Sequence, residues 1–251
     1  MNHFSKLLLV CAPLAGLAAC GGSDTADRLD VADPVVRFVH ASPVAPNLTL
    51  YRGTVAQSDA TNVPYKFASN YFDVDMGISP WPVKTADGVA TIGTESIDPV
   101  RGTKYTIVAL PASSTGSSTY LIVDPYNRSL NGDPAYLRVM NASFNADNID
   151  LYMTAVGTNI AAAGVTPFIA GTKYKTAGPA SGGDSAQIQG GTYQVTVASA
   201  GTKTVLFNGQ LSIGNSKDVL LLTVPDTVVP GAIKVLVKTE GAAGAAELAP
   251  S

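Results

Sequence analysis

Hydrophobic and polar residues alternate in short runs along most of the chain. Residues 35–40 and 48–51 form one pair of such runs, and residues 136–141 and 149–152 form another pair further on. Side chains of a β-strand alternate between two faces, so an alternating run of four to six residues predicts a strand. The segments between the runs are rich in Pro, Asn and Asp, which favour turns. Each pair therefore predicts a strand, a turn and a second strand.

The two pairs also match in sequence. Residues 37–51 (RFVHASPVAPNLTLY) and 138–152 (RVMNASFNADNIDLY) are identical at seven of 15 positions. Similarity at a fixed offset indicates a repeated structural unit. Later runs also correspond in character, and the pairs are 71–76 with 193–198 and 105–110 with 219–224. We therefore expect two copies of one module.

The remaining runs are also short and rich in Val, Ile and Tyr, and they lie at 89–92, 120–123, 204–207 and 233–237. No long stretch shows helical periodicity. Short strands without helices bury their apolar faces mainly by packing two antiparallel sheets together. The predicted fold is therefore all-β, with two tandem antiparallel β-sandwich domains. We expect the first sandwich at 35–125, a connector at 126–136 and the second sandwich at 137–240.

The N-terminus has the parts of an export signal. A short charged region at 1–6 precedes an apolar run at 7–19, which is shorter than the roughly 20 residues of a membrane-spanning helix. The run ends in Leu17-Ala18-Ala19-Cys20, which resembles the lipobox of bacterial lipoproteins. That resemblance implies removal of residues 1–19, acylation of Cys20 and attachment to a membrane. The alternative is an ordinary secreted protein in which Cys20 is incidental.

Composition indicates which segments are flexible and which partners and membrane are favoured. Residues 21–34 are small and acidic, and they are expected to form a flexible tether; residues 241–251 lack bulky side chains and are expected to form a disordered tail. The whole chain has a formal net charge of −3 and shows no basic cluster, which argues against nucleic acid as a partner. Gly21 differs from the Asp that tends to retain similar lipoproteins at the inner membrane, so the outer membrane is favoured.

The phrase VRFVHASPVAPNLTLY at 36–51 resembles the DUF4397 family of bacterial envelope proteins, whose function is undefined. The second copy departs from it, because Phe144 and Asp147 replace Pro43 and Pro46. The resemblance implies immunoglobulin-like sandwiches that are often repeated and exported. It supplies no catalytic residue.

A serine hydrolase relay requires a histidine, and His40 is the only one left after removal of the signal. It directly precedes the turn Ala41-Ser42-Pro43, and Asn141 takes its place in the second copy. Asn can hydrogen-bond a turn as His can, but it cannot act as a general base. We therefore favour a structural role for His40 and keep ligand contact as an alternative.

Carboxylates offer two other kinds of site. Asp73 and Asp75 alternate along one strand face and would suit a hydrolase, although an exposed sheet face explains them equally well. Together with Asp147 and Asp150 they are also candidate calcium ligands, since calcium prefers oxygen. Their spacing does not match an EF-hand, and turn formation is the simpler interpretation. One His and one acylated Cys cannot make a transition-metal site, so no cofactor is expected.

Two further features invite a functional interpretation. Trp81, the only tryptophan, lies between two prolines in an expected loop, where it would either stack on a ligand or cap the sandwich core. Arg37 and Arg138 hold equivalent strand positions, and we expect each to pair with a nearby Asp.

Three hypotheses follow. The leading one is a lipid-anchored, non-enzymatic envelope protein that binds a protein or a glycan. The alternatives are an envelope hydrolase that uses carboxylates and a structural spacer.

Overall fold

The computed structural model of the chain describes residues 33–126 and 133–251. Within these ranges the regular structure is almost entirely β, with one short 3-10 turn, η1 (Ser58–Ala60). No helix in the described part is long and apolar enough to cross a bilayer. The predicted signal peptide, Cys20, nearly all of the predicted tether and most of the connector lie outside the described residues.

The first half of the chain forms a sandwich of two four-stranded sheets. Its inner sheet has the order β4 (Phe72–Asp73), β1 (Val35–His40), β7 (Lys104–Pro111) and β8 (Ser117–Asp124). Its outer sheet has the order β3 (Val55–Ala56), β2 (Leu48–Arg52), β5 (Ser79–Thr85) and β6 (Thr91–Ile97).

The second half forms another sandwich. Its inner sheet has the order β12 (Thr176–Gly178), β9 (Ala135–Asn141), β16 (Asp218–Pro225), β17 (Ile233–Thr239) and β18 (Ala246–Glu247), and β13 (Ala186–Ile188) also pairs with β9. Its outer sheet has the order β11 (Ile169–Lys173), β10 (Asn148–Thr154), β14 (Gly191–Ser199) and β15 (Val205–Ile213). The prediction of two tandem β-sandwiches is confirmed.

Each inner sheet contains one parallel pair, β1 with β7 and β9 with β16. These two pairs are exceptions to the expected antiparallel pairing. Parallel neighbours need a long crossover connection, and here the intervening chain builds the outer sheet before it returns. The parallel strand is therefore added to each inner sheet late in the chain order.

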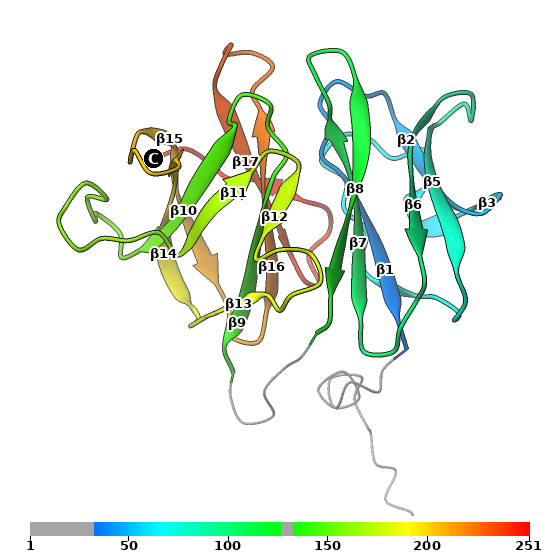
Figure 1. Cartoon of the computed structure of the whole chain (residues 1–251), viewed down its shortest axis with the longest axis horizontal. Coiled ribbons are helices and arrows are strands. Elements are labelled where there is room, and N and C mark those ends of the chain that lie inside the picture. Colours follow the sequence, from blue (N-terminus) through cyan, green and yellow to red (C-terminus); the bar gives the residue numbers. More distant parts are fainter. Residues whose placement is uncertain (1–32, 127–132) are drawn as a thin grey trace, which may run out of the picture.

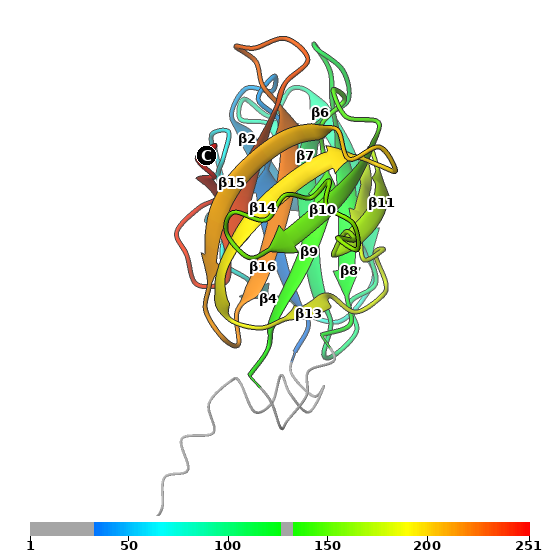
Figure 2. The ribbon, with the colours of Figure 1, turned by 90° about the vertical axis from the view of Figure 1, so that its left-hand side faces the viewer.

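The two sandwiches pack against each other through their inner sheets, so that the molecule has four layers (Figure 1; Figure 2). Three apolar clusters fill the spaces between the layers. One lies inside each sandwich, and the third joins them. The third cluster combines side chains of both halves, and its main members are Val39, Val108, Leu110, Ile122, Met140, Leu220, Leu222, Val224 and Leu236. The two sandwiches thus share a core.

This arrangement explains why the inner strands are buried along their length. In β7, Tyr105 and Ile107 pack inside the first sandwich, whereas Val108 and Leu110 on the opposite face pack against the second sandwich. All eight residues of β7 are buried. An inner strand therefore has no solvent face, and its sequence alternates between two different apolar environments.

The predicted match between 71–76 and 193–198 is wrong. Residues 71–76 contribute only the short edge strand β4, whereas Tyr193 lies in β14, a central strand paired with β10 and β15. The strand of the first half with equivalent pairing is β5, between β2 and β6. Its prolines, Pro80 and Pro82, concealed it, because proline interrupts a strand ladder. Both pair with residues of β6, but their polar backbone groups face the β2 side, where Pro80 O accepts from Gly53 N at 2.7 Å. The pairing of β5 with β2 ends at Val83, so the missing N–H groups disrupt no ladder bond.

The predicted disordered tail is also wrong. Residues 246–247 form β18, which pairs with β17, and Leu248 N donates to Val235 O at 2.8 Å. Glu247 pairs with Lys234 of the second half at 3.1 Å and also with Lys66 of the first half. Small residues do not prevent ordering here, because the backbone extends an existing sheet edge and one carboxylate bridges the two halves.

Candidate functional site

The interface between the sandwiches is apolar at one end and charged at the other. At the end where β1 begins, Arg37, Lys104, Arg138 and Asp218 occupy interface positions of the four central inner strands. Asp124, Lys238 and Glu240 lie at the ends of the neighbouring strands. We call these seven residues the junction cluster. It is the largest gathering of buried charge in the described part of the chain.

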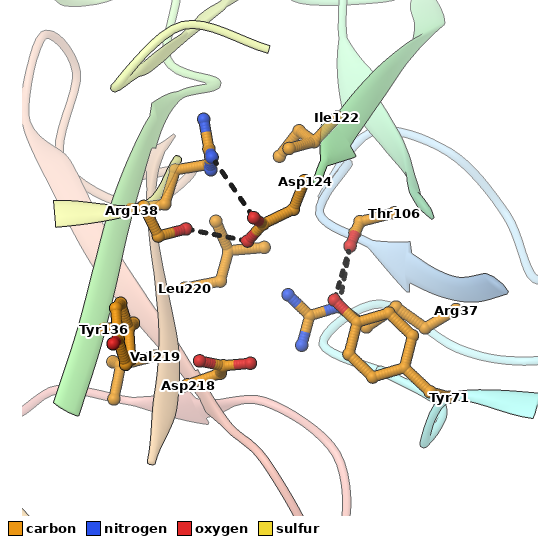
Figure 3. A pocket seen from close by; sticks show the side chains of 11 residues that line it. Arg37, Tyr71, Thr106, Ile122, Asp124, Tyr136, Arg138, Asp218, Val219 and Leu220 are labelled. Atoms are coloured by element: carbon orange, nitrogen blue, oxygen red, sulfur yellow. Dashed lines mark hydrogen bonds and ion pairs between the residues drawn. The ribbon is translucent and has the colours of Figure 1, made fainter. Parts of the chain in front are cut away.

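Arg138 anchors one side of the junction cluster (Figure 3). Its Nη1 donates to Pro179 O and to Ala180 O, the latter at 2.8 Å, and its Nη2 donates to Gly183 O at 2.5 Å. Its Nη2 also lies 3.9 Å from Oδ1 of Asp124, which belongs to the first half. Asp124 accepts a further hydrogen bond from Ser185 Oγ at 2.8 Å. Arg138 thus holds a loop of its own half and contacts the other half.

Lys104 occupies the centre of the junction cluster. Its ammonium lies 3.3 Å from Asp218 Oδ2 and 2.9 Å from Glu240 Oε1, and it lies 3.3 Å from the centre of the Tyr126 ring. Burial disfavours the charged ammonium, but the two carboxylates outweigh burial and raise the pKa of Lys104. This lysine of the first half is therefore a fully charged partner for two carboxylates of the second half.

Arg37 is equivalent in position to Arg138 but differs in its partners. It is 6% exposed; its Nε donates to Thr106 Oγ1 at 2.8 Å, and its guanidinium lies 4.6 Å from the centre of the Tyr71 ring. Its Nη1 is buried without a hydrogen-bond partner, and no carboxylate of the described residues pairs with it. The expected ion pair with an Asp is thus found for Arg138 and is absent for Arg37 in the described part of the chain.

Lys238 is a second buried cation with incomplete pairing. It is 1% exposed, and its Nζ donates to Ala242 O and, at 3.4 Å, to Asn70 Oδ1 of the first half. Among the described residues no carboxylate lies within ion-pair distance of it. Burial, together with repulsion from Arg37, lowers the pKa of Lys238 to about 8. The two cations are therefore close enough to destabilise each other.

A cavity of about 230 Å³ lies beside these two cations. Its lining comes from both halves and consists of Arg37, Ser69, Asn70, Tyr71, Lys238, Glu240 and Gly241. Asn70 and Gly241 are exposed, which places them at the mouth of the cavity. A smaller cavity of about 20 Å³ adjoins Arg37 and Tyr71 on the side of Asp124 and Arg138 (Figure 3). The smaller cavity suits one water molecule, and the larger one is big enough for a small solute.

The structure places His40 at the end of β1, directly before a turn. It is fully buried; its Nε2 lies 2.9 Å from Pro46 O, and its Nδ1 accepts a hydrogen bond from Ser42 N at 3.4 Å. Burial lowers the pKa of His40, which favours the neutral ring that these two bonds require. Both ring nitrogens are therefore engaged by the protein, and ligand contact by His40 has no geometric support.

Trp81 is not in a loop. It lies in β5, is fully buried, and packs in the apolar core of the first sandwich, with Phe72 at 6.4 Å between ring centres. The expectation that it stacks on a ligand is corrected, because no face of its ring is open. The alternative expectation, a core position, describes it better.

The structure disperses the candidate carboxylates. Asp73 and Asp147 are exposed, Asp75 lies 3.6 Å from Arg52, and Asp150 accepts hydrogen bonds from Gly171 N at 2.8 Å and Gly201 N at 2.9 Å. Among the described residues no group of three or more His, Cys, Asp or Glu side chains is arranged to hold a metal ion. Asp150 thus holds strand β11 and the turn that follows β14. The structure does not bring the four carboxylates together.

Sequence reasoning missed Lys238, Tyr71 and Glu240 as site residues. Lys238 directly follows the run predicted at 233–237, where a charged residue indicates the boundary of a strand, but β17 continues to Thr239. The available signal was Arg37 itself, a charged residue among apolar neighbours in a strand without solvent exposure. The cavity beside Arg37 forms only when the two halves pack together. A local sequence pattern does not predict that packing.

Comparison with protein families gives one match. Residues 34–152 match the model of the DUF4397 family, a domain of unknown function. In the structure the DUF4397 match covers the first sandwich and continues through β9 and most of β10 of the second. No curated protein matches the chain.

Solved structures with a detectable likeness include two streptococcal virulence factors studied for alpha-glucan binding, the second through family 41 carbohydrate-binding modules. They share 13% identity with this chain and cover 76% and 78% of it and 93% and 94% of their own length, with TM-scores of 0.24 and 0.23. A third is a family 26 carbohydrate-binding module of Eubacterium rectale Amy13K in complex with maltoheptaose, with 9% identity, 87% and 98% coverage and a TM-score of 0.22. At these scores the likeness carries no inference about a ligand of this chain.

Proposed function

We propose that this chain is a non-enzymatic binding protein of the cell envelope, anchored through a lipid on Cys20, which presents two fused sandwiches to a partner protein. The lipobox-like sequence before Cys20 supports the anchor. The fusion of the two sandwiches supports the binding role, because loops on a rigid scaffold make effective recognition surfaces.

The observation that carries this proposal is that the fused body has two different ends, one with the starts of the central strands and one with the hairpins that follow them. Val35 pairs with Lys104 at the start of β7, and Lys104 pairs with Asp218 at the start of β16. The starts of these strands therefore share one end, which is also where the described chain begins, just before Val35 (Figure 1). The β7–β8 and β16–β17 hairpins lie at the opposite end, which we call the far end. A lipid on Cys20 would direct the far end away from the membrane.

The β16–β17 hairpin has the features of a contact surface. At its tip Val228 is 79% exposed and Val229 is 53% exposed. Asp226 Oδ1 accepts hydrogen bonds from both of their backbone amides, at 2.7 and 3.2 Å, and Asn145 Nδ2 donates to Ala232 O at 2.8 Å. The tip is therefore held in one shape, which reduces the entropy lost on binding.

An aliphatic tip favours a protein over a glycan. Sugars are commonly bound against aromatic rings, and the most exposed large hydrophobic residues of the described chain are Val, Met and Ile. The non-enzymatic assignment is supported by His40, whose nitrogens are both engaged, and by the dispersed carboxylates.

The test uses the detergent-solubilised full chain as bait for proteins of the envelope fraction. We expect a bound partner to be lost when Val228 and Val229 are both changed to Asp, and to be kept when Val205 on β15, 51% exposed, is changed to Asp. Retention by the Val228→Asp and Val229→Asp double variant would contradict the proposed surface. Palmitate labelling tests the anchor, since label retained on a Cys20→Ser variant would refute it.

A further inference from the structure

The junction cluster contains two buried cations, Arg37 and Lys238, that have no carboxylate partner among the described residues. Arg37 is 6% exposed and Lys238 is 1% exposed. Placing an unpaired charge in a protein interior costs several kcal/mol unless a counter-charge or hydrogen bonds compensate it. The neighbouring buried cations Lys104 and Arg138 have such a counter-charge, since each lies within ion-pair distance of a carboxylate.

The two unpaired cations line one cavity, and they come from different halves of the chain. Arg37 belongs to β1 of the first sandwich and Lys238 to β17 of the second. The cavity has a volume of about 230 Å³ and a mouth at Asn70 and Gly241. A solute could therefore enter from solvent and meet both cations.

The charges around the cavity leave a positive balance. Glu240 is its only lining carboxylate, and Oε1 of Glu240 is engaged by Lys104 at 2.9 Å. Tyr71 contributes a neutral hydroxyl, because burial raises its pKa. Arg37 and Lys238 against Glu240 leave one net positive charge on the lining, and Asn70 and Ser69 add neutral polar groups.

We propose that this cavity binds a small oxyanion, a phosphate, sulfate or carboxylate group, between Arg37 and Lys238. A guanidinium offers a planar pair of N–H donors that matches such groups, and an ammonium adds a point charge. The buried Nη1 of Arg37 has no partner, so the guanidinium retains donor capacity that the protein does not use. The bound group would contact both sandwiches and would stabilise their packing, since a ligand that binds only the folded state raises its stability.

This site is independent of the far end. The cavity lies at the end where β1 begins, whereas the proposed partner surface is the β16–β17 hairpin. Failure of one proposal therefore leaves the other intact.

The experiment is a calorimetric titration of the detergent-solubilised full chain with inorganic phosphate, sulfate and succinate, at constant ionic strength with chloride as the balancing anion. We expect saturable binding of at least one of the three at a single site, together with a rise in the melting temperature. The order of the three affinities distinguishes a tetrahedral anion from a carboxylate.

Lys238→Met is the decisive variant, because it removes the charge and keeps most of the side-chain volume. We expect it to weaken binding about tenfold to a hundredfold, the usual effect of losing one charge-assisted hydrogen bond. Arg37→Gln should weaken binding to a similar degree. Lys217→Met is the matched control, since it changes the net charge equally at an exposed position outside the cavity.

Three outcomes would overturn the proposal. They are absence of saturable binding for all three anions, unchanged binding by Lys238→Met, and equal weakening by Lys217→Met. Arg37→Gln removes a buried hydrogen bond to Thr106 and could unfold the chain. In that case the folded Lys238→Met variant, checked by circular dichroism, still decides the result.

Discussion

His40 and Asn141 make the same two kinds of hydrogen bond at the same place in the two sandwiches. Ser42 N donates to Nδ1 of His40, and Ser143 N donates to Oδ1 of Asn141, at 3.4 and 3.2 Å. On its other side His40 contacts Pro46 O at 2.9 Å, and Asn141 Nδ2 donates to Ala146 O at 2.7 Å. An imidazole and an amide thus close the turn after the first strand of each half.

This relationship predicts a graded response to substitution of His40. His40→Asn should retain the bond from Ser42 N and lose about 1 kcal/mol of unfolding free energy, whereas His40→Ala should lose about 3 kcal/mol because buried polar groups lose both partners. Chemical denaturation measures both values. Equal losses for the two variants would show that the ring acts by its volume and not by its bonds.

The same histidine predicts a pH dependence. Burial lowers the pKa of His40 in the folded state, so the unfolded chain binds the proton first as the pH falls. Stability should therefore decrease as the pH falls from about 6.5, the ordinary histidine value, towards the lower pKa of the folded state. His40→Asn should flatten the profile in this window. An unchanged profile would assign the effect to other groups.

Lys238 predicts a change in the alkaline range. Its pKa is about 8 when folded, so between about 8 and the ordinary value of 10.5 the unfolded state holds more protons than the folded state. In the absence of a bound anion, stability should rise with pH in this window, by at most about 1.4 kcal/mol for each pH unit. The contribution should be missing from Lys238→Met, which guanidinium titrations at pH 7.5, 8.5 and 9.5 would show.

The shared core predicts that the two sandwiches unfold together. Leu222 lies in the cluster between the inner sheets, and it is fully buried. Leu222→Ala should cost about 2–5 kcal/mol and should lower protection from hydrogen exchange in both halves. Loss of protection confined to the second half would indicate two independent domains.

The ordered C-terminal segment gives a prediction about its ion pairs. Glu247 pairs with Lys66 and Lys234, but all three side chains are about one-third exposed. Glu247→Gln should therefore cost less than about 1 kcal/mol. Deletion of residues 246–251 should cost more, because it also removes the β18 ladder and the Leu248 contact with the core. Thermal melts of both variants test the ranking.

The sequence predicted a strand best where apolar and polar residues alternate clearly and turn residues flank the run. The runs of β1, β2, β9 and β10 were located almost to the residue, because alternation and turn residues agree there. β5 was missed because a strand tolerates proline only where the proline nitrogen faces away from a ladder. Which way it faces is known only once the neighbouring strands are known. The C-terminal strand was missed because its stability comes from a pre-existing edge and from Glu247.

The site was harder to predict than the fold. Arg37 was noticed as a charge within a buried strand, but its expected Asp partner is absent among the described residues. The reason is that the packing of the two halves pairs Asp218 and Glu240 with Lys104 and not with Arg37. Such competition between distant residues is visible only when the sandwiches are packed together.

The proposed function requires that the far end of the anchored, fused body contacts a partner protein. The most direct test places a photoreactive amino acid at position 228 of the full chain in intact cells, with position 205 as the matched exposed control, and identifies the crosslinked products by mass spectrometry. We predict one dominant protein partner from position 228 that is absent from position 205. A glycan product, the same products from both positions, or no product from position 228 would contradict the claim.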